Sequence, residues 1–484
     1  MTERQLHNRD QGHHEGQLAL EAETGREQVP TQKQTETQTP ISRSISSSAP
    51  SVSIQSRVLN EHQIALLGRK LELHLPYSIP LLRRIQFHLQ QERASTTARI
   101  FVAAVRGDDS TITRSNPEPE SEPEPELDRP WDLDAWLLET QSSDDTPWIA
   151  AHVDLVNAGQ TQVWVFGSWE EQAELSRPPT ESHPMHNRRL LRHQLLLLRA
   201  LFTYISRDLI PLLPTTPPEE WLCLARTGKY LSRPYSRDKV LFGSVSDKLW
   251  HLFPESARTR TDAGYWKYLF CRDFTSEAPP LPPGYRFGGM QDDDLQTVLD
   301  RTPIPRTLGT LRQLVSVGVF HEGNTVRVPV PIPVPVPVPA PGAVGWGFLG
   351  KDASLSSLHT EVEHRGRGLA VALGAELLRR HQRQEQQQQQ QQQPPPPPPP
   401  VVVHSQCGRG DNGSQEERRD EDENAREAMT TSTSTSTSWW GHADVSQHNA
   451  ASRRVMEKLG GRPAWMVMWT EVDMCVLLAL EGWL

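Results

Sequence analysis

Cysteine is scarce in this sequence, with four residues among 484. No CxxC pair occurs and no histidine stands at ligand spacing from the four, which are Cys223, Cys271, Cys407 and Cys475. This scatter argues against a zinc site or a disulfide framework, so we expect no bound metal. Reduced thiols in an intracellular, most simply cytoplasmic, protein are the preferred interpretation.

Long apolar runs are also missing. The longest one near the C-terminus, Met474–Leu480, is far shorter than the ~18 apolar residues that a membrane span needs. The N-terminal stretch lacks the charged-then-apolar pattern of secretory signals. The sequence therefore predicts no membrane partner.

Positive charge is not in excess, as it would be for a protein with a nucleic-acid-binding face. The net charge is −10, and two acidic low-complexity stretches account for it. Residues 107–128 hold eight acids and one base, and residues 416–427 hold seven acids and three bases. Because the remainder is near neutral, we expect no nucleic-acid partner.

Four stretches have compositions that bury too little apolar surface to fold alone, and we expect them to be disordered. They are the tail 1–57, the acidic insert 107–130, a Val-Pro insert at 328–341 and the segment 384–438, with its polyglutamine and polyproline runs. Alternate prolines predict an extended polyproline spacer. What remains predicts two domains, residues 58–270 and 282–484.

The first domain has a mixed α/β pattern and no catalytic constellation. Helical periodicity covers Ile64–Leu75, Ile79–Leu89 and Arg189–Leu213. Strand-like segments cover Ile100–Val105, Trp148–Val156 and Val163–Trp169.

The second domain has the same mixture. Expected strands are Gly284–Gly289, Val315–His321, Gly345–Leu349, Leu355–Val362, Trp440–Val445 and Trp465–Val472. Expected helices run over Asp292–Asp300 and, capped by Thr307, over Leu308–Leu314.

A glycine-bearing loop, Arg365-Gly-Arg-Gly-Leu-Ala370, separates the strand Leu355–Val362 from a helix with an apolar stripe. The stripe consists of Leu369, Leu373 and Leu377. Glycines let a phosphate approach the backbone closely, and the N–H groups at a helix N-terminus favour an anion. The loop therefore predicts a pyrophosphate site.

The spacing R-x-x-G-x-A in this loop resembles the GNAT superfamily of acyl-CoA N-acyltransferases. A second match follows at Asn449-Ala-Ala-Ser452, which leads into a helix that ends at Leu459-Gly460. The resemblance covers residues 282–384 and 438–473, and the stretch Gly345–Ala370 looks most like the glycine N-acyltransferase branch. A preceding α/β domain fits that branch as well.

The resemblance implies a GNAT fold, with a mixed central sheet whose fourth and fifth strands splay, preceded by a second α/β domain. Acetyl-CoA or another acyl-CoA would lie in the splay as co-substrate. The backbone of Leu358 and Thr360 would pair with its pantetheine. The other implied cofactor-binding residues are Arg365, Gly366, Arg367, Gly368, Leu369, Ala370 and Asn449.

Two catalytic positions depart from the family pattern. Relatives place a glutamate eleven residues before the loop arginine, where this chain has Ser354, and a tyrosine seven residues after the asparagine, where it has Met456. An attacking amine is mostly protonated near neutral pH, so a base helps. Asp352 and Glu361 are the candidate catalytic residues, and His359 is a further candidate.

The expected activity is acyl transfer from acyl-CoA to the amine of a small molecule or an amino acid. Two alternatives remain. The departures at Ser354 and Met456 fit a non-catalytic acyl-CoA-binding protein. Pro394–Pro400 fits an interaction adaptor with a proline-recognising partner. Deleting Gln386–Ser436 would abolish function only in the adaptor.

Overall fold

The computed structural model describes residues 53–91, 95–106, 131–139, 146–171, 184–229, 231–262, 264–275, 280–322, 342–392 and 439–480. These residues belong to one compact unit, residues 51–484. The inserts expected at 107–130 and 328–341, nearly all of the tail 1–57 and most of the segment 384–438 lie outside the described residues. Among the described residues, no helix is long and apolar enough to span a membrane.

A nine-stranded mixed sheet contains strands from both halves of the chain. Its strand order is β1 (Ser53–Val58), β2 (Arg99–Arg106), β3 (Trp148–Val153), β4 (Val163–Gly167), β5 (Lys239–Ser246), β13 (Arg462–Asp473), β7 (Tyr265–Phe270) and β12 (Gly441–Ser446), with β6 (Arg258–Thr261) on β13. Neighbours are antiparallel except β4 and β5, which meet in one parallel bridge between Val163 and Phe242. The expected strands β2, β3 and β4 are confirmed.

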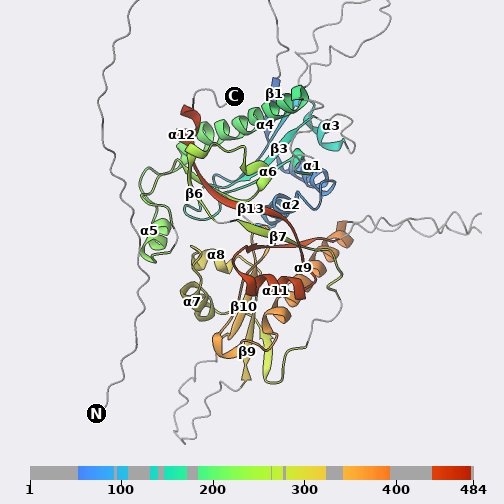
Figure 1. Ribbon diagram of the computed structural model, residues 1–484, viewed down its shortest axis with the longest axis vertical. Helices are drawn as coiled ribbons and strands as arrows, with labels where there is room; N and C mark the ends of the chain where they lie inside the picture. Colours follow the sequence, from blue (N-terminus) through green and yellow to red (C-terminus); the bar gives the residue numbers. More distant parts are fainter. Residues whose placement is uncertain are drawn as a thin grey trace, which may run out of the picture. The chain divides into compact units, whose positions relative to one another are not determined.

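Helices cover both faces of this sheet (Figure 1). One face packs against α4 (Pro184–Tyr204), and the other against α1 (Glu61–Glu72), α2 (Ile79–Leu89) and α3 (Leu133–Leu138). Strand β3 is apolar except for His152 because it is buried on both faces: Ile149 and Val153 face the first core, while Trp148 and Ala150 face the second. Helix α1 begins at Glu61, before the predicted start at Ile64, because Asn60 and Gln63 form a capping box.

A second sheet of four antiparallel strands has the order β11 (Leu355–Thr360), β10 (Gly345–Leu349), β9 (Ser316–His321) and β8 (Tyr285–Gly288). Helix α9 (Leu369–Gln392) packs on β9, β10 and β11. Gly347 allows this close approach, because a Cβ there would lie 2.7 Å from Leu377 Cδ1. Trp346 and Phe348 point to the opposite face, toward α7 (Asp292–Arg301) and α8 (Leu308–Arg312). Thr307 caps α8 as predicted.

The last two strands of the chain join the first sheet. Strand β13 lies between β5 and β7, and β12 pairs with β7. The sheets therefore divide between β11 and β12, and the large sheet crosses the domain boundary expected between residues 270 and 282. Apolar periodicity locates a strand but does not identify its partner, so this exchange could not be predicted from the sequence. The short helices α5 (Glu219–Arg226), α6 (Asp247–Trp250), α11 (Ala450–Lys458) and α12 (Met474–Ala479) complete the fold.

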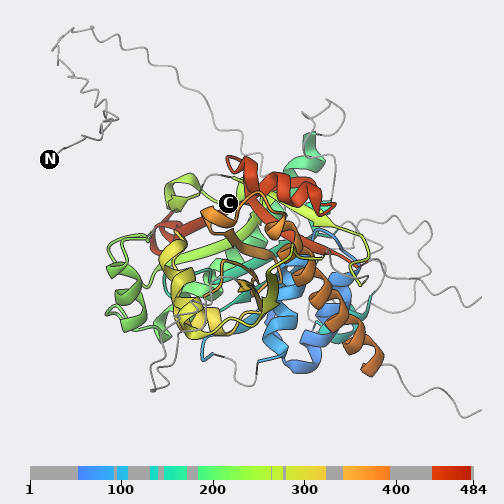
Figure 2. The ribbon, with the colours of Figure 1, turned by 90° about the horizontal axis from the view of Figure 1, so that it is seen from below.

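Two segment ends differ from the prediction. Strand β1 begins at Ser53, inside the stretch expected to be disordered, because it pairs in register with β2. Helix α9 continues to Gln392, nine residues into the segment 384–438. Glutamine is a good helix former, and contacts hold this part of the helix. Glu385 pairs with Arg83 of α2 and accepts a hydrogen bond from Trp439 Nε1 at 2.6 Å. Figure 2 shows α9 beside the blue helices.

Candidate functional site

Strands β11 and β12 end their respective sheets, so each has one edge without a paired strand among the described residues. A hydrogen bond of 2.7 Å from His442 Nε2 to the Asp352 carbonyl joins the starts of the two strands. Because the Glu361 N–H donates to the Val344 carbonyl, the alternate residues Thr360 and Leu358 direct their backbone groups to the free edge. Pairing with an extended pantetheine chain needs this orientation.

A β-bulge interrupts β11 beside this edge. The register against β10 shifts between Trp346 and Phe348, and Ser357 opposite has a φ of 51°. Its hydroxyl is buried and has no hydrogen-bond partner among the described residues. A serine in the left-handed region costs about 1–3 kcal/mol, and such strain gathers at functional sites. The sequence carries no signal for this bulge.

The loop after β11 has the geometry of an anion site. Gly366 and Gly368 have φ values of 78° and 80°, and a Cβ at either would meet open space. The N–H of Ala372 makes the first helical bond of α9, to the Gly368 carbonyl, so the N–H groups just before it have no acceptor within the helix. Arg365 Nε donates to the Thr360 carbonyl at 2.9 Å and anchors the loop to β11. Residues 365–368 are exposed.

The same loop opens the apolar stripe that the sequence predicts. Leu369, Leu373 and Leu377 are all buried in the core beneath the small sheet. Arg379 and Arg380, later in α9, both pair with Glu376.

Asn449 stands at the second motif, between β12 and α11. Its side-chain oxygen accepts from the Ser452 N–H at 3.0 Å and caps the helix. Gly460, with a φ of 83°, follows the helix end as expected. Within the described part of the chain the amide nitrogen of Asn449 has no hydrogen-bond partner, so capping and cofactor binding are compatible.

Substituting Asn449 separates these two roles. Asn449→Ala should lower stability by about 1 kcal/mol through loss of the cap, whereas Asn449→Ser should keep it. We expect both variants to weaken acyl-CoA binding roughly threefold to tenfold, as for the loss of one hydrogen bond. Thermal melting and titration calorimetry measure the two effects. A serine variant that binds as tightly as the parent would make Asn449 a capping residue only.

A buried polar cluster surrounds the point where β11 and β12 start. Lys267 Nζ of β7, with no exposed surface, lies 2.6 Å from Asp444 Oδ1 and 3.2 Å from His442 Nδ1, and it donates to Ser244 Oγ at 2.7 Å. Ser354 Oγ donates to Asp352 Oδ1 at 2.6 Å. The cluster joins three strands and the turn before β11, so only long-range folding assembles it.

The charge state of the cluster follows from its contacts. Burial, aided by the Lys267 ammonium, lowers the pKa of His442 to about 4, so its ring is neutral near pH 7. Burial alone would raise the pKa of Asp352. The nearby His442 and Lys267 and two hydrogen bonds from Ser354 outweigh burial and hold the pKa below its usual value. Asp352 is therefore an ionised carboxylate in contact with Ser354.

Asp352, His442 and Asp444 also have the spacing of a metal site, with ligand atoms within 4.8 Å of one another. The Lys267 ammonium already contacts two of these residues, so a divalent cation would have to displace it.

The other candidate catalytic residues have structural partners. Glu361 Oε1 accepts from Arg301 Nε at 3.0 Å. His359 stacks on Trp346, with ring centroids 4.5 Å apart, and burial lowers its pKa. Met456 is 3% exposed and packs in the core. Of the proposed bases, Asp352 alone contacts Ser354 in the described part of the chain.

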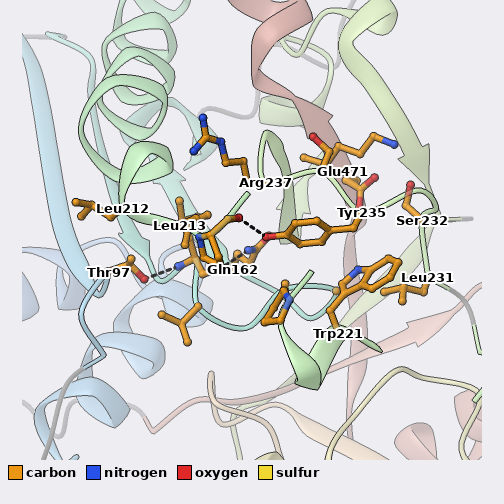
Figure 3. Close-up of a pocket in the computed structure, with 18 of the residues that line it drawn as sticks. Thr97, Gln162, Leu212, Leu213, Trp221, Leu231, Ser232, Tyr235, Arg237 and Glu471 are labelled. Atoms are coloured by element: carbon orange, nitrogen blue, oxygen red, sulfur yellow. Dashed lines mark hydrogen bonds between the residues drawn. The ribbon is translucent and has the colours of Figure 1, made fainter. Parts of the chain in front are cut away.

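A pocket of ≈ 250 Å³ lies elsewhere, between the β3–β4 loop and the segment that leads into β5 (Figure 3). Trp221 and Tyr235 line it as an edge-to-face pair. Two of its polar side chains bond the backbone: Tyr235 donates to the Pro214 carbonyl, and Gln162 bonds the backbone of Leu155 and Leu241.

One protein family matches part of the chain. Residues 51–268 match the family model described as the acyl-CoA N-acyltransferase verG N-terminal domain. No curated protein sequence matches significantly.

Several solved structures resemble the chain distantly. A Drosophila protein is 12% identical, with 86% of this chain and 98% of that chain covered and a TM-score of 0.43. A tandem GNAT protein from the clavulanic acid biosynthesis pathway is 10% identical, with 87% and 99% covered and a TM-score of 0.34. A GCN5-related N-acetyltransferase from Sphaerobacter thermophilus is 9% identical, with 87% and 96% covered and a TM-score of 0.36. At these TM-scores the likenesses assign neither fold nor function.

Proposed function

We propose that the chain is an acyl-CoA N-acyltransferase of the GNAT type, and that its residues 282–473 bind the acyl-CoA and transfer the acyl group to a small amine. The match of residues 51–268 to an acyl-CoA N-acyltransferase N-terminal domain supports this proposal. One observation carries the proposal: the bulged strand β11 has a free edge and leads through two left-handed glycines into the N-terminus of α9. The free edge suits pantetheine, and the loop suits pyrophosphate.

Each proposed residue has a task in this reaction. The N–H groups of Gly366, Gly368 and Ala370 bind the pyrophosphate, and Arg367 adds positive charge beside it. The backbone of Leu358 and Thr360 orients the thioester at the bulge. Asp352, acting through the Ser354 hydroxyl, takes the proton that the amine loses on attack. With Met456 in place of a phenol, the leaving thiolate takes its proton from solvent, and holding the reactants together supplies much of the rate.

Calorimetric titration and thiol release test this function together. We expect acetyl-CoA or a longer acyl-CoA to bind the protein, and free thiol to appear only when a suitable amine is added from a panel. Absence of binding would contradict the proposal.

A second candidate is an acyl-CoA-binding protein without catalysis. The buried Met456 and the serine at position 354 favour it, because neither supplies the usual acid or base. Tight acyl-CoA binding with no thiol release for any amine would select this alternative.

A further inference from the structure

Helix α4 presents four arginines to solvent. They are Arg188, Arg189, Arg192 and Arg199, and all four are exposed, whereas the opposite side of the helix packs in the first core. Their separations of three, four and seven residues place them on one face. The 21 residues of α4 include neither aspartate nor glutamate. We call this surface the α4 basic face.

No described side chain pairs with the α4 basic face. Its four arginines make no hydrogen bond or ion pair in the described part of the chain. Helix α12, which contacts α4, has no charged residue. Burial, together with the charges of Arg189 and Arg192, lowers the pKa of the adjacent His193, so the field at this face is positive. Because like charges three or four residues apart on a helix repel each other, an anionic occupant would stabilise the face.

The acidic insert 107–130 begins close to this face, at the end of β2. Tyr204, at the C-terminal end of α4, stacks on Phe101 in the first half of β2, with ring centroids 5.1 Å apart. The N-terminal end of α4 lies beside β1 (Figure 1), and Ser53 of β1 pairs with Arg106, the last residue of β2. The N-terminal half of the α4 basic face therefore lies toward the end of β2 at which the insert begins.

The insert has the composition and the length to occupy the face. Residues 107–128 hold eight acids and one base. The glutamate-rich run starts at Glu118, twelve residues after β2, and a chain of that length reaches about 40 Å, more than the ~30 Å length of α4. The other acidic stretch, 416–427, follows α9, which packs on the small sheet instead. The insert 107–130 is therefore the acidic segment that begins beside the face.

We propose that the α4 basic face binds the acidic insert 107–130 of the same chain. Carboxylates of the insert pair with the guanidinium groups, each of which can hold one carboxylate through two N–H groups. The chain linkage favours this partner over a free polyanion, because it keeps the insert at a high local concentration beside the face. This pairing is independent of the proposed acyl transfer.

Limited digestion of the full chain with a glutamyl endopeptidase tests the pairing. Such a protease can cut the insert after Glu120 and Glu126, because a proline follows each of the other glutamates there. Cuts within residues 416–427 give an internal standard, and mass spectrometry measures the ratio of the initial rate in the insert to the rate in this standard. A bound insert is cut slowly, so we expect a low ratio that rises with salt, which screens exposed charges.

Replacing Arg188, Arg189 and Arg192 together by glutamine should raise this ratio several-fold to about tenfold at low salt, as expected for the loss of three exposed ion pairs. Glutamine is a good helix former, so α4 should persist. Lysine at the same three positions should keep the parent's ratio, because it keeps the charges. Arg226→Gln on α5 and Arg312→Gln on α8 are the controls, since each removes an exposed arginine of another helix and should leave the ratio unchanged.

Two results would overturn the proposal. One is the same ratio in the parent and in the glutamine variant at low salt. The other is a parent chain that binds heparin at physiological salt and loses this binding in the glutamine variant, which would assign the face to an external polyanion. If thermal melting shows that the glutamine variant is unfolded, the parent alone decides, because a ratio that stays constant from ~0.05 M to ~0.5 M salt also excludes the pairing.

Discussion

Replacing Gly368 by valine is expected to weaken acyl-CoA binding by about 10²-fold. The residue has a φ of 80°, where a β-branched side chain is strained by roughly 1–2 kcal/mol, and a Cβ there would point into open space at the proposed phosphate site. If the loop keeps its conformation, the valine side chain would collide with the bound phosphate. If the loop relaxes instead, its backbone N–H groups would no longer point at the phosphate. Either outcome costs about 2–3 kcal/mol of binding free energy. Titration calorimetry measures it.

Gly228 provides a matched control. It has a φ of 66°, nothing lies within 4 Å of its virtual Cβ, and it follows α5 far from the loop in sequence. Gly228→Val should lower the melting temperature about as much as Gly368→Val and leave acyl-CoA binding unchanged. If Gly368→Val is folded and binds the coenzyme as tightly as the parent, the loop is not the phosphate site.

Asp352→Asn is expected to lower kcat by about 10²-fold, the lower end of the range for a general base, without changing acyl-CoA affinity. The effect should be at this end because a carboxylate with a lowered pKa is a weak base. Asparagine keeps an oxygen that can accept from Ser354, so the turn should persist. Asp294→Asn is the control, since Asp294 is a buried carboxylate that accepts the backbone N–H groups of Gln291 and Ala343.

The pH dependence adds a second test. Because its pKa lies below the usual value, Asp352 is ionised across the neutral range, and the parent rate should rise with pH as the amine deprotonates. Acceptors with an amine pKa nearer ~8 than ~10 should be preferred. The ionised group stabilises the fold above its unfolded pKa, and this contribution is lost as pH falls through the folded value. A variant with the parent's rate and pH profile would eliminate Asp352 and leave the reaction to positioning.

The sequence predicts those parts of the site whose residues lie close together along the chain. The stripe of Leu369, Leu373 and Leu377, the glycines of the loop and the caps Thr307 and Asn449 are local patterns, and the structure confirms those elements. Their roles toward acyl-CoA stay predictions.

What could not be foreseen depends on partners distant in sequence. In the cluster of Lys267, His442 and Asp352, His442 lies 175 positions from Lys267 and 90 positions from Asp352 along the chain. No sequence spacing predicts that they meet. A charged lysine inside the otherwise apolar strand Tyr265–Phe270 was the one available hint. The bulge at Ser357 depends on the pairing of β11 with β10. The glutamine-rich end of α9 is helical beside Glu385, which pairs with Arg83 of a distant helix.

The place of β13 between β5 and β7 also governs how the protein is made. Translation proceeds at roughly 5–20 residues per second, so on the order of 10–40 s separate the emergence of β7 from that of β13. Throughout that interval β5 and β7 each have an unpaired edge, and unpaired strand edges can pair with other chains and cause aggregation. Strands β5 and β7 therefore complete their pairing only after β13 has been synthesised. A stop codon shortly before residue 462 would damage the beginning of the protein as severely as its end.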